Sequence, residues 1–234
     1  MILIIPNFNQ LVYLKNLINQ WQSYNPDYDI YVIDNGSTYE PLLDYYNSGI
    51  KAYIVRYKQN DFVGNLRSWI DTNKPEWYVI SDPDISIHPA TPPNFLDYFK
   101  QAIEQGYHRA GFDLIYDDIP DWNPKKQWIQ GDQKELHGDK VLVGDYVGYR
   151  APIDTTFALY TSHNSGWQAP MSGKDWGNCV RLFKAYHLPF YEHKDYLNEE
   201  RKYYYQSTKK RDRGKPSAGR SHFNPYSGMY EDGE

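Results

Sequence analysis

The chain has 234 residues and a formal net charge of −5, from 30 acidic and 25 basic side chains. This length is ample for one α/β domain with a real core, and the negative charge argues against a general nucleic-acid binder. Aromatic residues make up 17% of the chain, more than a core alone uses, so stacking surfaces for sugars or bases are one expected use.

The first third of the chain alternates short apolar runs with segments of helical periodicity. Each run is typical of a strand buried on both faces, and apolar residues at helical spacing follow it. Asn9 is a candidate N-cap for the first helix. Three rounds of strand and helix imply right-handed crossovers and a parallel sheet of the nucleotide-binding type. The expected strands are residues 2–5, 30–33 and 52–55, and the expected helices begin near residues 10, 40 and 60.

The apolar stretch over residues 77–87 contains two aspartates one residue apart, Asp82 and Asp84. Ligands of parallel α/β sheets gather outside the carboxyl ends of the strands, where this pair emerges, and Pro83 fixes the bend between them. Two carboxylates on such a bend can hold a hard divalent ion. The alternative is an ordinary turn, because Asp followed by Pro is common turn chemistry. No glycine-rich phosphate loop is present, so if phosphates bind here, a metal on Asp82 and Asp84 would neutralise them.

The later part of the chain has weaker periodicity. Residues 174–183 place Cys179, Val180 and Phe183 on one face of an expected helix, which makes Cys179 a buried thiol. Asp175 then lies in the first turn, where the helix dipole favours a carboxylate. The other expected elements are a helix over 95–103, a strand over 110–116, loops or short strands over 117–150, a strand over 151–160 and a short apolar segment over 187–191.

Three further features concern location, cysteine chemistry and the end of the chain. Met1 leads directly into the first apolar run and no apolar stretch is long enough to span a bilayer, so we expect a soluble, cytoplasmic protein. A single cysteine excludes an intramolecular disulfide and a structural zinc cluster. Residues 209–220 are basic and carry glycine and proline, which indicates either a solvated tail or a flap that folds over phosphates.

The order and spacing of these features resemble a GT-A glycosyltransferase of the family 2 type, over residues 1 to about 195. The resemblance implies an α/β fold of the nucleotide-diphospho-sugar transferase type, with a mostly parallel central sheet flanked by helices. It implies a single catalytic domain over 1–195, with a nucleotide-binding half at 1–87 and an acceptor-binding half at 88–195. Residues 196–234 then form a C-terminal extension, helical at first and then basic and flexible. The segments that carry the resemblance are Ile-Pro-Asn-Phe-Asn (5–9), Val-Ile-Asp-Asn-Gly-Ser-Thr (32–38), the Asn-rich helix start (60–65), Asp-Pro-Asp (82–84), Lys-Asp-Trp-Gly-Asn-Cys-Val-Arg-Leu (174–182) and His-Leu-Pro-Phe-Tyr (187–191).

The resemblance also implies which residues form the site. The general base would be Asp175; the family usually has Glu-Asp where this chain has Lys174-Asp175, and Asp154 is the substitute. Imidazole is a softer ligand than carboxylate and suits Mn²⁺ better than Mg²⁺, and a lone histidine otherwise has a structural role. The metal, Mn²⁺ or Mg²⁺, is expected on Asp84, Asp82 and His187, with His193 as the fallback. The nucleotide-sugar donor, with a UDP-sugar favoured, is expected on Pro6, Asn7, Phe8, Asn9, Asp34, Asn65, Asp82, Pro83 and Asp84.

By this resemblance the chain is expected to be a metal-dependent glycosyltransferase. It would move a sugar from a nucleoside-diphosphate sugar to a hydroxyl of a carbohydrate acceptor, with inversion if the attack is direct. Aromatic residues between Tyr116 and Trp167 are candidates for an acceptor platform, or equally for core. Two alternatives are a nucleotidyltransferase, which would use a glycine-rich, lysine-containing loop where this chain has residues 6–9, and a non-catalytic carbohydrate-binding module, which would explain the aromatic content.

Overall fold

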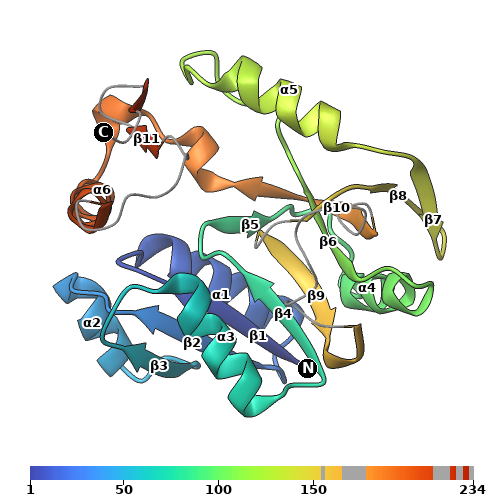
Figure 1. Cartoon of the computed structure of the whole chain (residues 1–234), viewed down its shortest axis with the longest axis horizontal. Helices are drawn as coiled ribbons and strands as arrows, with labels where there is room; N and C mark the ends of the chain where they lie inside the picture. Colours follow the sequence, from blue (N-terminus) through green and yellow to red (C-terminus); the bar gives the residue numbers. More distant parts are fainter. Residues whose placement is uncertain (154–155, 165–177, 213–221, 225–228, 232–234) are drawn as a thin grey trace.

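The computed structural model describes residues 1–153, 156–164, 178–212, 222–224 and 229–231 (Figure 1). In this part of the chain ten strands form one mixed sheet, with the order β3-β2-β1-β4-β9-β6-β10-β8-β7 and with β5 paired to β10. A separate pair joins β11 and β12. The strands are β1 Ile2–Asn7, β2 Asp29–Asn35, β3 Tyr53–Tyr57, β4 Trp77–Ser81, β5 Ile85–Ile87, β6 Arg109–Leu114, β7 Lys140–Val143, β8 Tyr146–Arg150, β9 Phe157–Thr161, β10 Cys179–His187, β11 His222–Asn224 and β12 Met229–Glu231.

Helices cover both faces of the sheet and divide the core in two. Leu3 and Ile5 of β1 pack in one cluster with residues of α1, α2 and α4, whereas Ile4 packs on the other face with α3. This is the alternation that a strand imposes on successive side chains. The α-helices are α1 Val12–Tyr24, α2 Glu40–Asn47, α3 Phe62–Asn73, α4 Phe95–Glu104, α5 Lys126–Leu136 and α6 Glu199–Asp212.

The alternation of strand and helix predicted for the first part of the chain is confirmed. β1, β2 and β3 pair in parallel, and β4 joins the other side of β1 in the same direction. Their carboxyl ends therefore meet at one edge of the sheet, where the register sets Asn7 of β1 opposite Asp34 of β2. Antiparallel pairing enters beyond β4, with β9. The predicted α/β fold with a central, mostly parallel sheet flanked by helices is thus confirmed.

The helix expected over residues 174–183 is wrong from Cys179 onward, because Cys179, Val180 and Phe183 lie on the strand β10. β10 pairs with β6, β8 and β5, and its first five residues are all buried. A strand buried on both faces loses the alternation of apolar and polar residues, so its apolar positions can imitate helical spacing. Cys179 is buried, as expected.

Two other segments differ from expectation. The sequence predicts only loops or short strands over residues 117–150, but the structure has α5 there, ahead of the antiparallel pair β7 and β8. Among the residues of α5 only Ile129 and Gln133 are buried, so this helix lacks the apolar stripe that would reveal it. The strand expected over 151–160 begins only at Phe157.

The start of α1 is capped from the far end of the chain. Asn9 is not its N-cap: the Asn9 side chain instead accepts hydrogen bonds from the amides of Thr38 and Tyr39 at the start of α2, at 2.7 and 3.0 Å. The amides of Leu11 and Val12 donate to the carboxylate of Glu200 on α6, at 2.9 and 3.0 Å. A carboxylate at a helix N-terminus satisfies unpaired amides and opposes the helix dipole.

The first turns of α6 pack against the loop that joins β1 to α1. Arg201 forms an ion pair with Glu192 and donates to the side chain of Gln10 at 2.7 Å. Six residues further along α6, the hydroxyl of Ser207 accepts a hydrogen bond from the side chain of Asn9 at 3.1 Å. Among the described residues, no helix is long and apolar enough to cross a bilayer.

Candidate active site

Backbone pairing brings the aspartate motif and His187 together. The segment Asp82-Pro83-Asp84 connects β4 to β5, and β5 pairs antiparallel with the end of β10, which places Ile85 opposite His187. The Leu188 amide donates to the Asp84 carbonyl at 2.9 Å, which ties the two segments at this point. A strand pair therefore fixes the distance between these two side chains.

Nε2 of His187 faces the Asp84 carboxylate, and each of the two side chains also carries a buried polar atom without a hydrogen-bond partner among the described residues. Nε2 of His187 lies 3.6 Å from Oδ1 of Asp84. Oδ1 of Asp84 and Nδ1 of His187 are buried and have no hydrogen-bond partner among the described residues. Buried polar atoms are normally paired, so a carboxylate oxygen and an imidazole left in this state suit a divalent cation. Within the described residues, no group of three or more His, Cys, Asp or Glu side chains is assembled as a metal site.

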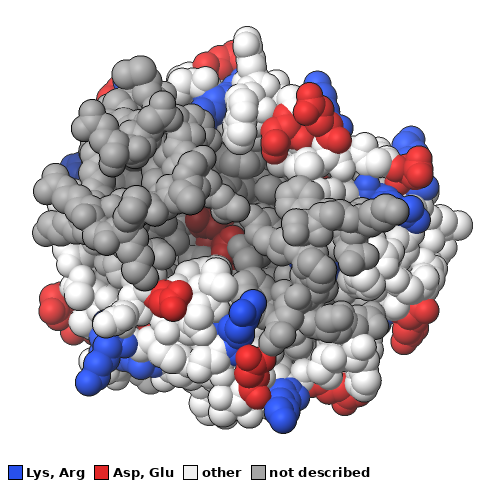
Figure 2. Space-filling model, in the orientation of Figure 1, with Lys and Arg blue, Asp and Glu red and all other residues white. Residues whose placement is uncertain are grey.

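These residues border a cavity of about 270 Å³, which we call the aspartate cavity. Its lining comes from the β1–α1 loop, the start of α3, the aspartate motif, the end of β10 and α6. In the space-filling view of Figure 2, acidic side chains lie recessed in a central hollow. The lining residues are Pro6, Phe8, Gln10, Asn60, Phe62, Asp82, Pro83, Asp84, His187, Tyr204 and Thr208.

Four of the predicted donor-binding residues lie outside this lining. Asp34 is fully buried, and its carboxylate lies 3.4 Å from the guanidinium of Arg56 and 3.3 Å from the hydroxyl of Tyr46. The side chain of Asn7 is also buried and donates to that Tyr46 hydroxyl at 2.9 Å. Here Asp34 and Asn7 tie α2 to the ends of β1 and β2.

The other two, Asn9 and Asn65, also hold loops in place. Asn9 has a positive φ of 54° and spans the β1–α1 loop and the start of α2, through the contacts given above. The side-chain amide of Asn65 donates to the side-chain oxygen of Asn35 at 2.8 Å and to the backbone carbonyl of Gln59 at 2.9 Å. Both therefore support the loops that carry the lining residues.

Tyr204 of α6 lines the aspartate cavity, although the sequence did not predict it as a site residue. Burial raises its pKa to about 12, and the Asp84 carboxylate adds to the shift, so the hydroxyl stays protonated and able to donate. Among the other lining residues not predicted for the site, Asn60 and Phe62 belong to the Asn-rich segment 60–65, whereas Gln10 and Thr208 have no motif of their own. The run of three tyrosines at 203–205 was the single sequence signal for this part of the site.

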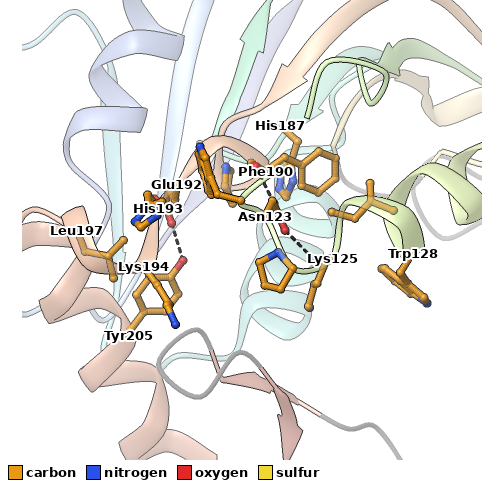
Figure 3. Close-up of a pocket in the computed structure, with 14 residues that line it drawn as sticks. Asn123, Lys125, Trp128, His187, Phe190, Glu192, His193, Lys194, Leu197 and Tyr205 are labelled. Atoms are coloured by element: carbon orange, nitrogen blue, oxygen red, sulfur yellow. Dashed lines mark hydrogen bonds between the residues drawn. The ribbon is translucent and has the colours of Figure 1, made fainter. Parts of the chain in front are cut away.

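A second and larger cavity, of about 450 Å³, lies beside the first (Figure 3). We call it the aromatic cavity. His187 belongs to both linings, so the two cavities meet at this side chain. The residues of the second lining come from α5 and the segment before it, from residues 187–197 and from α6: Trp122, Asn123, Pro124, Lys125, Trp128, Ile129, His187, Pro189, Phe190, Glu192, His193, Lys194, Leu197 and Tyr205.

A buried ion pair separates the two cavities. The guanidinium of Arg201 contacts the rings of Tyr204 and Tyr205, 4.5 and 4.9 Å from their centroids. Tyr204 lines the aspartate cavity, whereas Tyr205 lines the aromatic cavity. The Glu192 carboxylate accepts from the hydroxyls of Tyr13 and Tyr205 and pairs with Arg201. We call the Arg201–Glu192 pair the wall between the cavities. Because Arg201 and the two tyrosines belong to α6, this helix contacts both cavities.

The predicted general base lies outside the described residues. Asp175 and its substitute Asp154 both fall in parts of the chain that the structure does not describe. Of the other predicted site residues, the structure brings Pro6, Phe8, Asp82, Pro83, Asp84 and His187 together around one cavity.

Comparison with known proteins identifies the family. Residues 2–157, or 156 of 234, match the family described as Glycosyl transferase family 2. No curated protein matches the chain significantly. The crystal structure of GalNAc-T7 with UDP, GalNAc and Mn²⁺ aligns with a TM-score of 0.51 at 13% identity, over 79% of this chain and 42% of that one. Crystalline S. aureus TarS 1-349 aligns with a TM-score of 0.46 at 10% identity, over 79% and 59%.

This chain spans less than two thirds of either solved protein, and at these identities the likeness to GalNAc-T7 shows the fold alone. The family match covers the strands that carry the aspartate motif, and the fold agrees with the GT-A type. The chain belongs to glycosyl transferase family 2 and has a fold of the GT-A type.

Proposed function

We propose that this enzyme transfers a sugar from a nucleoside-diphosphate sugar, with UDP favoured, to a hydroxyl of a carbohydrate acceptor, with a divalent metal held in the aspartate cavity. The observation that carries the proposal is the approach of His187 to Asp84, with unsatisfied polar atoms on both, at the carboxyl ends of parallel strands. Family membership and the UDP and Mn²⁺ of GalNAc-T7 support the choice of nucleotide and metal.

The side chains present fit such a metal. Asp84 offers a hard oxygen and His187 a softer nitrogen, a pair that suits Mn²⁺ better than Mg²⁺. When bound, the ion would neutralise negative charge on the departing nucleoside diphosphate. Asp82, on the same turn, is the second carboxylate available to the metal or to the ribose.

Other residues of the chain would bind and orient the donor. Phe8 and Pro6 form an apolar wall of the cavity against which a base or ribose can pack. The protonated hydroxyl of Tyr204 faces the carboxylate end of the cavity and can donate a hydrogen bond to a phosphate oxygen. Asp175, or Asp154 in its place, would accept the proton of the acceptor hydroxyl, and a direct attack would invert the anomeric centre.

A thermal-shift panel tests the proposal. UDP, GDP, dTDP and CMP are added with Mn²⁺ or with EDTA, and a ligand of the native state raises the melting midpoint by mass action. We expect one nucleotide to raise the midpoint only with Mn²⁺, and we expect Asp84→Asn to lose this shift. Asp44→Asn, at an exposed position of α2, is the matched control and should keep it.

Two results would contradict the proposal. A nucleotide shift that persists in EDTA and in Asp84→Asn would remove the metal from the site. A shift with free oligosaccharides and with no nucleotide would instead indicate a carbohydrate-binding module.

A further inference from the structure

The aromatic cavity has the position that a second substrate needs. It meets the aspartate cavity at His187, and the Arg201–Glu192 wall separates the two elsewhere. A ligand in each cavity would therefore approach the other beside His187. None of the residues predicted to bind the donor lines the aromatic cavity, whereas two histidines predicted for the metal do, the shared His187 and the fallback His193.

Large aromatic side chains line this cavity and remain open to solvent. Trp122 is 42% exposed and Trp128 is 59% exposed. Phe190 packs edge-on against His187, with ring centroids 4.5 Å apart. Indole and phenyl faces at an open cavity offer flat apolar area, against which the C–H face of a pyranose can lie.

The charge around the cavity is positive among the described residues. Its one carboxylate, Glu192, is neutralised by Arg201 and accepts from two tyrosine hydroxyls. The remaining charged side chains of the lining are Lys125 and Lys194, together with the imidazoles of His187 and His193. In Figure 3, Lys125 lies between Trp128 on one side and Tyr205 with Glu192 on the other.

One of these lysines is placed beside an indole. Nζ of Lys125 lies 5.9 Å from the ring centroid of Trp128. A sugar ring stacked on this indole would bring a substituent within reach of the ammonium group. Burial lowers the pKa of Lys125 to about 8, so a negative charge placed there would recover part of the lost solvation.

We propose that the aromatic cavity is the acceptor subsite and that it takes a pyranose carrying a negatively charged group, such as a carboxylate or a phosphate. The ring would pack on the exposed indoles, and the charged group would pair with Lys125. This inference rests on the proposed function, because an acceptor subsite has meaning only beside a donor site.

Ligand titration by NMR tests the inference on the whole chain in the presence of UDP and Mn²⁺. The probes are methyl β-glucoside, methyl β-glucuronoside, glucose 6-phosphate and inorganic phosphate. We expect both anionic sugars to bind about tenfold more tightly than the neutral glucoside and than phosphate alone, since a charge-assisted hydrogen bond is stronger than a neutral one. Lys125→Gln should abolish the preference for the anionic sugars, and Trp128→Ala should weaken all three sugars.

Matched variants control for general effects. Lys134→Gln removes an exposed lysine of the same helix, and Tyr196→Ala removes an aromatic side chain that is 84% exposed outside the lining. Neither should change sugar affinity. Equal affinity for charged and neutral sugars, or a preference that survives in Lys125→Gln, would overturn the inference while UDP binding stands. If UDP fails to bind, the proposed function falls, and the acceptor role falls with it.

Discussion

The two cavities are built from different kinds of secondary structure. Strand register fixes the aspartate cavity, because β4, β5 and β10 hold Asp84 and His187 at a set distance. Among the described residues, the end of β10 is the one strand segment in the wall of the aromatic cavity. Residues 122–125, α5, short 3-10 turns and α6 supply the rest. With the proposed roles of the two cavities, sheet backbone holds the groups that bind the donor, and side chains from loops and helices select the acceptor.

The largest effect on stability and binding is expected from disrupting the Arg201–Glu192 ion pair between the two cavities. Arg201→Met leaves Glu192, whose side chain is only 11% exposed, without its cation, and loss of one partner of a buried pair costs about 3 kcal/mol. Urea unfolding should register this loss. Affinities for UDP and for anionic sugars should fall together, because the wall touches both cavities.

An Arg201→Met chain with an unchanged unfolding free energy would contradict the structural role of the wall. The double variant with Glu192→Met is the control. It removes the stranded carboxylate and should recover part of the stability.

His187 is the residue that the two cavities share, and its loss tests whether they act together. His187→Ala should weaken Mn²⁺-dependent UDP binding by about 10- to 100-fold, through loss of a metal ligand, and should also weaken sugar binding. Calorimetric titration measures both. An effect confined to the sugar would place the metal on the aspartates alone, whereas His193→Ala should leave UDP binding unchanged.

The charge of Lys125 provides a test of the acceptor role proposed for the aromatic cavity. Its pKa is lowered to about 8, so the ammonium is present below that pH and is lost above it. Affinity for methyl β-glucuronoside should therefore fall about tenfold from pH 7 to pH 9. The other ionisable groups that face this cavity are Lys194, Glu192, His187 and His193. A Lys125→Gln chain with the same pH profile would assign the effect to one of them.

The smallest effect is expected on the donor side of the wall. Tyr204→Phe removes one hydroxyl that faces the aspartates and should weaken UDP binding about fivefold, the value of one ordinary hydrogen bond. Tyr203→Phe, whose hydroxyl bonds Thr38 outside the cavity, is the control. Equal losses in both variants would point to the packing of α6 instead of a contact with the donor.

The parts of the site that could be predicted from the sequence are those marked by short local motifs. An apolar run that ends in Asp-Pro-Asp can be recognised without knowledge of its distant partners. In the same way, Pro6 near the end of β1 and Phe8 just after it follow an apolar run. His187 was identified by resemblance, and its place depends on the pairing of β5 with β10, about 100 residues apart in sequence.

The remainder depends on packing between distant segments, which periodicity does not encode. Tyr204 and Arg201 reach the site only because α6 packs on the β1–α1 loop. Trp128 lies on a helix with too little buried surface to show an apolar stripe. Asn9 has the residue type of an N-cap but serves α2 instead of the helix that follows it.

The carboxylate of Glu200 at the start of α1 has a consequence for synthesis on the ribosome. β1 and α1 emerge well before α6, so the amides of Leu11 and Val12 receive their partner only after residue 200 has emerged. A missing cap costs about 1 kcal/mol, so the nascent sheet can form without it. Because α6 lines both cavities and follows β1 to β10 in the chain, the two binding surfaces are completed only after the ten strands of the sheet have been made.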